Sequence, residues 1–116
     1  MSRNALSCLA IVIGLAACAP ATLKPKPLDI RVEANRSTAA VGETLTFVVT
    51  TQGGALIGVE LDYGDNTVDQ FGTGGARTAR VTFRHAYLQS GTYTAKAVVT
   101  DAAAGQKQAT IEVRVN

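Results

Sequence analysis

Apolar and polar residues alternate along most of the chain after residue 27. In the stretch 44–51, for example, Leu45, Phe47 and Val49 share one side and threonines occupy the other. This period of two is typical of a β-strand with one buried face, and no segment shows the period of an amphipathic helix. The pattern predicts strands at 28–34, 44–51, 56–63, 76–84, 92–100 and 108–115, with 67–71 as a short edge strand.

Glycine-rich stretches separate these predicted strands. A turn is expected at Gly53-Gly54, a flexible loop at 72–75 and a further turn at 101–105, whereas 35–42 is expected to be a crossing segment or a short broken strand. The chain of 116 residues is long enough for one small domain. Six to seven short antiparallel strands in such a chain predict an all-β, two-sheet sandwich.

The N-terminus has a different pattern. Arg3 precedes a continuous apolar run over 5–17, which is shorter than the ~20 residues that a membrane-spanning helix needs. The run ends in Leu-Ala-Ala-Cys18, which resembles the lipobox of bacterial lipoproteins. That resemblance implies that residues 1–17 are a signal peptide and that Cys18 is lipid-modified after cleavage. The alternative is an ordinary secretory signal cut at an Ala-x-Ala site.

The lipobox resemblance also determines the expected organisation of the chain. Cys8 lies in the leader and Cys18 would carry lipid, so no cysteine is left for a disulfide and the domain must be held by packing. All three prolines fall at 20–27, so 18–27 is expected to be an extended tether and 28–116 the folded domain. Ala19 is not aspartate, and in a bacterium with two membranes the lipoprotein pattern then implies the outer membrane.

One motif stands out within the predicted strands. Residues 59–66 alternate as a strand and then break at Gly64-Asp65-Asn66, three strong turn formers. The run Asp62-Tyr63-Gly64-Asp65 resembles the signature of the PKD domain, an immunoglobulin-like β-sandwich module. Leu61 stands where that family usually has Trp, and Asn66 stands where it has its last Gly.

Further pieces agree with this resemblance, which covers roughly residues 32–115. They are His85-Ala-Tyr87, Gly91-Thr-Tyr93 and the Val-Thr-Asp run that ends at Asp101. In an immunoglobulin-like sandwich a tyrosine at the start of this strand can form a tyrosine corner, so Tyr93 is expected to be largely buried at the edge of the core, with its hydroxyl bonded to upstream backbone.

Three aspartates, Asp62, Asp65 and Asp101, are candidates for a calcium site, because hard cations bind clustered carboxylates and carbonyls. The alternative is that Asp62 and Asp65 cap turns by accepting backbone N–H groups. Their spacing matches no dense calcium loop, so we favour turn capping and expect neither a metal nor another cofactor besides the lipid on Cys18.

The sequence contains a single histidine, His85, and no Gly-x-Ser-x-Gly or Cys–His pattern accompanies it. The PKD resemblance places His85 at the end of a strand near the signature turn, so we expect it to make a structural hydrogen bond there, and we expect no enzymatic activity. Tyr63, Phe71 and Tyr87 belong either to the core or to an exposed binding face, and we favour the core for most of them.

A net charge of +2 with scattered basic residues argues against nucleic acid as a partner. The PKD resemblance implies a module for adhesion, spacing, or carbohydrate or protein binding. Together with the lipobox it predicts a lipid-anchored, non-catalytic interaction module of the cell envelope. Its partners would be the membrane, through the lipid, and an envelope protein or polysaccharide, with the oligomeric state left open. The alternative is an accessory subunit of an envelope complex that docks by a sheet edge.

Overall fold

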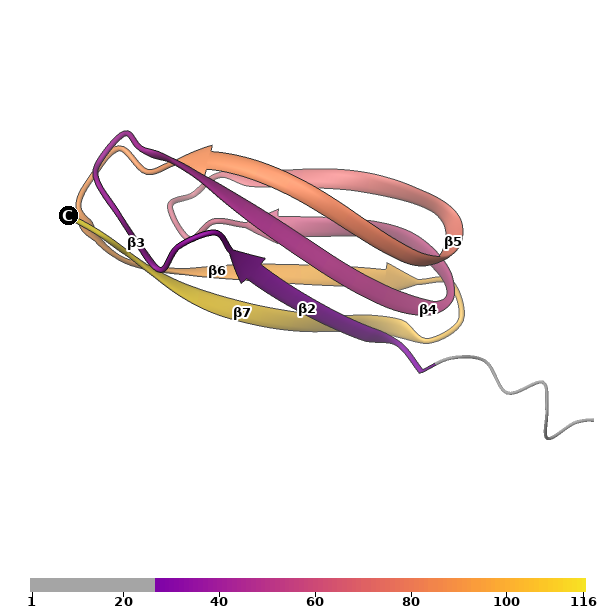
Figure 1. Cartoon of the computed structure of the whole chain (residues 1–116). Coiled ribbons are helices and arrows are strands. Elements are labelled where there is room, and N and C mark those ends of the chain that lie inside the picture. The colour runs from indigo at the N-terminus through magenta and orange to yellow at the C-terminus, as the bar shows by residue number, and fades with distance from the viewer. Residues whose placement is uncertain (1–26) are drawn as a thin grey trace, which may run out of the picture.

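The computed structural model describes residues 27–116, which form an all-β, immunoglobulin-like domain of six strands (Figure 1). None of these residues forms a helix of the length and apolarity needed to cross a membrane. The predicted signal peptide, Cys18 and almost all of the tether lie outside the described residues. The strands are β2 (Asp29–Ala34), β3 (Thr38–Ala39), β4 (Thr44–Asp62), β5 (Val68–Ala86), β6 (Gly91–Asp101) and β7 (Gly105–Val115).

Strands β4 and β5 form one long hairpin that contributes to both layers of the sandwich. The first half of β4, up to Gln52, pairs with β2 and with the second half of β5. The second half of β4, from Leu56, pairs with β6 and with the first half of β5. Figure 1 shows both strands bending round at the same end of the molecule. The two layers are therefore one curled sheet.

The turn predicted at Gly53-Gly54 and the loop predicted at 72–75 are wrong as strand boundaries. Both stretches lie inside the 19-residue strands β4 and β5. Register shifts between Gln52 and Gly58 mark the bend, and Gly74 and Gly75 have positive φ angles of 60° and 87°. The glycines bend the hairpin sharply, but its hydrogen-bonded ladder resumes beyond the bend. The strands predicted at 44–51 and 56–63 are therefore the two halves of β4, and those predicted at 67–71 and 76–84 are the two halves of β5.

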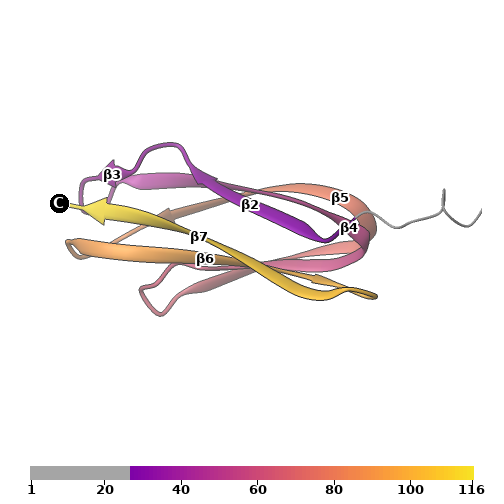
Figure 2. The same ribbon diagram turned by 90° about the horizontal axis from the view of Figure 1, so that it is seen from below.

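The remaining strands complete the two layers (Figure 2). Strand β6 pairs with β4 and with β7, both antiparallel. The short β3 crosses over from β2 and pairs with β7 in the parallel direction, with Thr38 opposite Arg114. The expected crossing at 35–42 is confirmed, but its strand departs from the all-antiparallel prediction because it runs in the same direction as the end of β7.

The core lies between the layers and is built from the predicted inward positions. Leu45, Phe47 and Val49 of the first layer are fully buried, and so are Ala97 and Val99 of the second. Leu61, at the usual tryptophan position of the PKD signature, is also fully buried. Period-two alternation therefore placed the core correctly on both sides of the bend.

Candidate functional site

The signature turn joins β4 to β5 at the end of the domain away from the start of β2 (Figure 1). Asp62 Oδ1 accepts a hydrogen bond from Gly64 N at 2.9 Å, and Asp65 Oδ1 accepts one from Thr67 N at 3.2 Å. Asn66 has a φ of 72°, a left-handed conformation that asparagine tolerates better than most residues. Both aspartates thus bond turn N–H groups, as the turn-capping alternative expects.

Gly64 is required at this turn for two reasons. Its φ is 84°, and a Cβ atom at this position would lie 2.6 Å from the carbonyl oxygen of Thr94. Backbone of β6 therefore passes directly against the turn. The signature fits this fold because a side chain here would push the turn away from the neighbouring strand.

His85, near the end of β5, connects that strand to the signature turn. Its Nε2 lies 2.6 Å from Asp65 Oδ2, and the two side chains are only 16% and 20% exposed. The imidazole ring stacks on Tyr63 with centroids 3.9 Å apart and contacts the edge of Tyr87. Burial alone would raise the pKa of Asp65, but hydrogen bonds from Thr67 and His85 outweigh it and lower that pKa. The histidine thus makes the structural contact expected of it.

Two buried tyrosines lie beneath this histidine. The hydroxyl of Tyr63 donates to Asp69 Oδ2 at 2.6 Å, and that of Tyr87 donates to the carbonyl oxygen of Tyr63 at 2.8 Å. Each residue is 1% exposed. Burial raises the pKa of both phenols above its usual range, so both remain protonated donors. Tyr63 and Tyr87 are therefore core residues, as we favoured.

Tyr93 makes its expected hydrogen bond, but it is less buried than the core tyrosines Tyr63 and Tyr87. The Tyr93 hydroxyl donates to the carbonyl oxygen of Gln89 at 2.8 Å, four residues upstream. Its ring stacks on Tyr87, with centroids 4.3 Å apart, and is only partly buried. Tyr93 begins β6 just after Gly91, at the end of the sandwich, so it covers Tyr87 from outside instead of filling the core.

Asp101 lies at the opposite end of β6 from the signature turn. Leu56 pairs with Asp101, whereas Asp62 pairs with Lys96, so Asp62 and Asp101 are about 20 Å apart along the strands. The Asp101 carboxylate accepts backbone N–H groups of Ala55, Ala103 and Ala104 at 2.6, 3.0 and 2.9 Å. These bonds, with that from Ala55 the largest, lower its pKa.

This separation bears on the calcium candidate. The structure does not bring Asp62, Asp65 and Asp101 together, and the domain over 27–116 holds no group of three or more His, Cys, Asp or Glu placed to bind a metal. Alternation along β6 could not reveal this, because the distance between the aspartates depends on how β4 and β6 pair.

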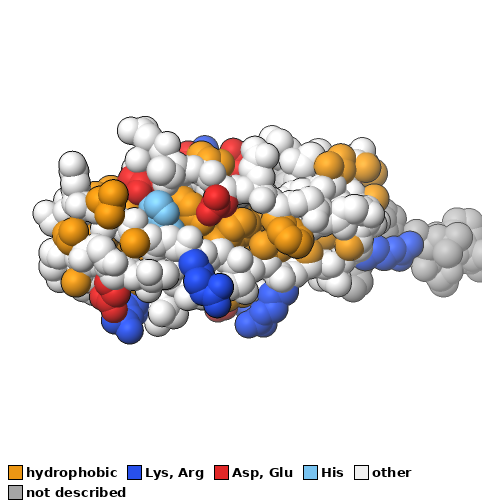
Figure 3. Space-filling model, turned by 90° about the horizontal axis from the view of Figure 1, so that it is seen from above, with side chains coloured by type: hydrophobic (Ala, Val, Ile, Leu, Met, Phe, Trp, Pro, Cys, Tyr) orange, Lys and Arg blue, Asp and Glu red, His pale blue; other side chains and the backbone are white. Residues whose placement is uncertain are grey.

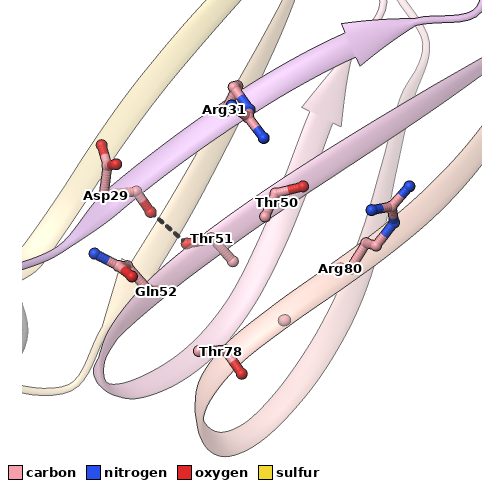
Figure 4. Close-up of a pocket in the computed structure, with 8 residues that line it drawn as sticks. Asp29, Arg31, Thr50, Thr51, Gln52, Thr78 and Arg80 are labelled. Carbon is pink, nitrogen blue, oxygen red and sulfur yellow. Dashed lines mark hydrogen bonds between the residues drawn. The ribbon is translucent and has the colours of Figure 1, made fainter.

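The surface of the described domain has open grooves that the sequence did not predict, and two of them are relevant here. A groove of about 400 Å³ lies over β2, β4 and β5 (Figure 4), and one of about 310 Å³ lies around Ile57 and Phe71. Phe71 is 53% exposed, so it is the one of the three candidate aromatics that reaches the surface. The only sequence signal was the polar side of each strand. Within the described domain, the residues that line the first groove are Asp29, Arg31, Thr50, Thr51, Gln52, Thr78, Ala79 and Arg80.

Comparison with solved structures shows the same fold in proteins of different kinds. The PKD domain of an M14-like peptidase from Thermoplasmatales archaeon SCGC AB-540-F20 is 22% identical, with a TM-score of 0.68 over 79% of this chain and 98% of its own. The PKD domain of the human VPS10 domain-containing receptor SorCS2 is 20% identical, with a TM-score of 0.53 over 99% and 95%. A superoxide reductase (neelaredoxin) from Ignicoccus hospitalis is 15% identical, with a TM-score of 0.54 over 84% and 87%. At these identities the likeness shows the fold alone.

A comparison with curated proteins found no match. The family comparison is decisive, because the model of the PKD domain matches residues 29–115, which include the signature turn, His85, both buried tyrosines and Asp101. The chain therefore belongs to the PKD domain family, and it carries a single such domain.

Proposed function

We propose that the protein is a lipid-anchored, non-catalytic interaction module of the cell envelope. In this proposal residues 1–17 are removed, Cys18 carries the lipid, 18–27 is the tether and 28–116 is the displayed domain. Membership of the PKD family supports a binding module, because such domains are generally non-catalytic. The motif that ends at Cys18 supports the anchor.

The observation that carries the non-catalytic part of the proposal is the use of the signature residues inside the fold. His85 contacts Asp65 and stacks on Tyr63, while Asp65 also bonds the turn. The imidazole of His85 and the carboxylate of Asp65 are thus engaged in holding β5 against the signature turn. A general base must instead be placed within reach of a substrate proton.

The end of the domain at which the described residues begin supports the proposed display. The first described residue lies at the end where β4 and β5 bend, and the C-terminus lies at the end of the signature turn (Figures 1 and 2). An anchor before residue 27 would therefore hold the bend close to the membrane and direct the signature turn away from it.

The anchor is tested by detergent-phase partitioning of the full chain expressed in a bacterium. Cys18→Ser should move the protein from the detergent phase to the aqueous phase, because the thiol that carries the lipid is gone. Cys8→Ser, inside the proposed leader, is the matched control and should partition like the wild type. If wild type and Cys18→Ser both stay in the aqueous phase, the protein is not a lipoprotein.

A second candidate function is that of an accessory subunit which docks by a sheet edge. Within the described domain β5 pairs only with β4 over its whole length, so its other edge is open. Open edges can accept a strand from a partner. Crosslinking in the intact envelope followed by affinity purification distinguishes the two functions, because one stable partner in fixed stoichiometry would favour the accessory role.

A further inference from the structure

The first surface groove is formed by two cross-strand rows on the outer face of one layer. Arg31, Thr50 and Arg80 are in register across β2, β4 and β5, and beside them Asp29, Gln52 and Thr78 form the next row. Figure 4 shows Arg31 and Arg80 on either side of Thr50. Because neighbouring strands are ~4.8 Å apart, the backbones of the two arginines are about 10 Å apart. The groove thus has two cationic walls and a polar floor.

The charged side chains that face the groove differ in whether they form ion pairs within the domain. Asp29 is paired with Lys107 at 3.4 Å, and Arg31 makes a long, solvent-exposed contact of 4.0 Å with Glu33. Such exposed pairs are weak and easily exchanged. Arg80 makes no ion pair with any residue in 27–116. The guanidinium groups are therefore available to an anionic ligand.

The net charge of the domain does not explain the basic groove, and the face itself carries Asp29 and Glu33 beside its arginines. Of the 11 Lys and Arg residues, Arg3, Lys24 and Lys26 precede the domain, whereas all nine Asp and Glu residues lie within it, so acidic residues slightly outnumber basic ones there. Arg84 lies on the same face as Arg80, opposite Thr46. Figure 3 shows basic side chains projecting along one margin of the molecule. Attraction of an anion would thus be local, not a result of net charge.

The chemistry of the groove indicates what kind of anion it fits. Backbone groups of β2, β4 and β5 are paired with one another across the floor, so only side chains can contact a ligand there. Those of Thr50, Gln52 and Thr78 present hydroxyl and amide groups, which hydrogen-bond to hydroxyl groups. Thr51 is excluded because it is buried and its hydroxyl donates to the carbonyl oxygen of Asp29. No large exposed apolar side chain lines this groove, which argues against insertion into lipid.

We propose that this groove binds an acidic polysaccharide, with carboxylate groups held by Arg31 and Arg80 and sugar hydroxyls held by Thr50, Gln52 and Thr78. Arginine suits this role because its planar guanidinium can hold a carboxylate through two parallel hydrogen bonds. The inference deepens the proposed interaction module by naming its ligand class. A strand-like acidic peptide fits less well, because its backbone would find no unpaired partner over a sheet face.

The test is calorimetric titration of the full chain in detergent with polygalacturonate, and with its methyl ester as a ligand of the same backbone without charge. We expect binding to polygalacturonate only. Arg80→Glu should weaken it at least about tenfold, which is the value of one charge-assisted contact, and Arg31→Glu should act in the same direction. Arg77→Glu is the matched control, since it makes the same charge change on β5 outside the groove and should alter affinity less than about twofold.

Three results would overturn the proposal. The first is no binding to polygalacturonate, and the second is an equal loss in Arg77→Glu and Arg80→Glu, which would mean diffuse surface charge. The third is equal affinity for polyglutamate, which would mean an acidic polypeptide ligand. Circular dichroism melts of each variant verify that it is folded, and Arg80→Lys, which keeps the charge, should retain part of the affinity. The binding assay does not depend on the lipid anchor, so it still tests the groove if the lipidation experiment fails.

Discussion

Two stacked tyrosines, Tyr87 and Tyr93, show how burial decides what a single hydroxyl contributes. Both hydroxyls donate to backbone carbonyls at 2.8 Å, but Tyr87 and its acceptor are buried, whereas the bond to Gln89 is exposed to water. Removing a buried donor leaves its acceptor without any partner, while an exposed acceptor can bond to water instead.

Tyr87→Phe should therefore destabilise the domain more than Tyr93→Phe. We expect a loss of ~1–3 kcal/mol in the free energy of unfolding for Tyr87→Phe and less than ~1 kcal/mol for Tyr93→Phe. Urea unfolding of the two variants and the wild type measures both values. The opposite order would show that the tyrosine corner at Tyr93, and not the buried Tyr87, holds this end of the sandwich.

Asp101 should make the stability of the domain depend on pH in the acidic range. Its pKa in the folded domain is lowered, so its contribution to stability is fully present above the ordinary aspartate pKa of about 3.9. The contribution is lost as the pH falls through the lower pKa of the folded state, because protonation removes the charge that accepts the N–H groups of Ala55, Ala103 and Ala104.

Asp101→Asn should accordingly unfold more easily than wild type at neutral pH and lose less stability on acidification below about pH 4. Urea midpoints measured over a pH series give the comparison. Glu112→Gln, on the exposed side of β7, is the control and should follow the wild-type curve. Parallel curves for wild type and Asp101→Asn would show that the Asp101 bonds do not carry the acid sensitivity.

At the scale of elements, glycines have two separate tasks. In the bend of β4 and β5 they let a continuous hairpin pass from one layer to the other. At Gly64 a glycine lets the signature turn approach β6, which needs both a positive φ and the absence of a side chain. The sequence pattern is the same in both places, because glycine marks any departure from an ordinary strand.

Gly64→Ala and Gly105→Ala distinguish conformation from packing. Both residues have nearly the same φ, 84° and 86°, but a Cβ at position 105 would meet nothing within 4 Å, whereas one at 64 would clash with Thr94. The left-handed conformation alone should cost ~1–2 kcal/mol in each variant. Thermal or urea unfolding should show an additional loss of at least ~1 kcal/mol for Gly64→Ala. Equal losses would mean that the turn moves away from β6 without cost.

At the scale of the whole molecule, the two ends of the sandwich differ. One end holds the signature turn, His85 and the C-terminus, and the other holds the bend, Asp101 and the start of β2. The first groove, which contains Arg31 and Arg80, extends towards the end with the bend, because Asp29 lines the groove and is the first residue of β2. In the proposed anchored protein this groove would face material close to the membrane, while the signature end would project outward.

The sequence by itself determined the class of fold, the core and the signature turn. Leu45, Phe47 and Leu61 could be assigned to the interior because period-two alternation is a local property, and Asp62 and Asp65 could be assigned to turn capping because a cap involves residues two positions apart. The contact of His85 with the signature turn followed from the family resemblance and not from its neighbours in the chain.

Only the tertiary structure decided which residues from distant strands meet. The ring of Tyr93 stacks on Tyr87, and Asp101 lies far from Asp62. The glycine stretches at 53–54 and 72–75 form a bend within one hairpin, and Arg31 and Arg80 lie on either side of β4. Each of these depends on strand register and on the path of the long hairpin, which are set by pairing between residues far apart in sequence. Alternation fixes the face on which a side chain lies, but it contains no information about the residue on the neighbouring strand.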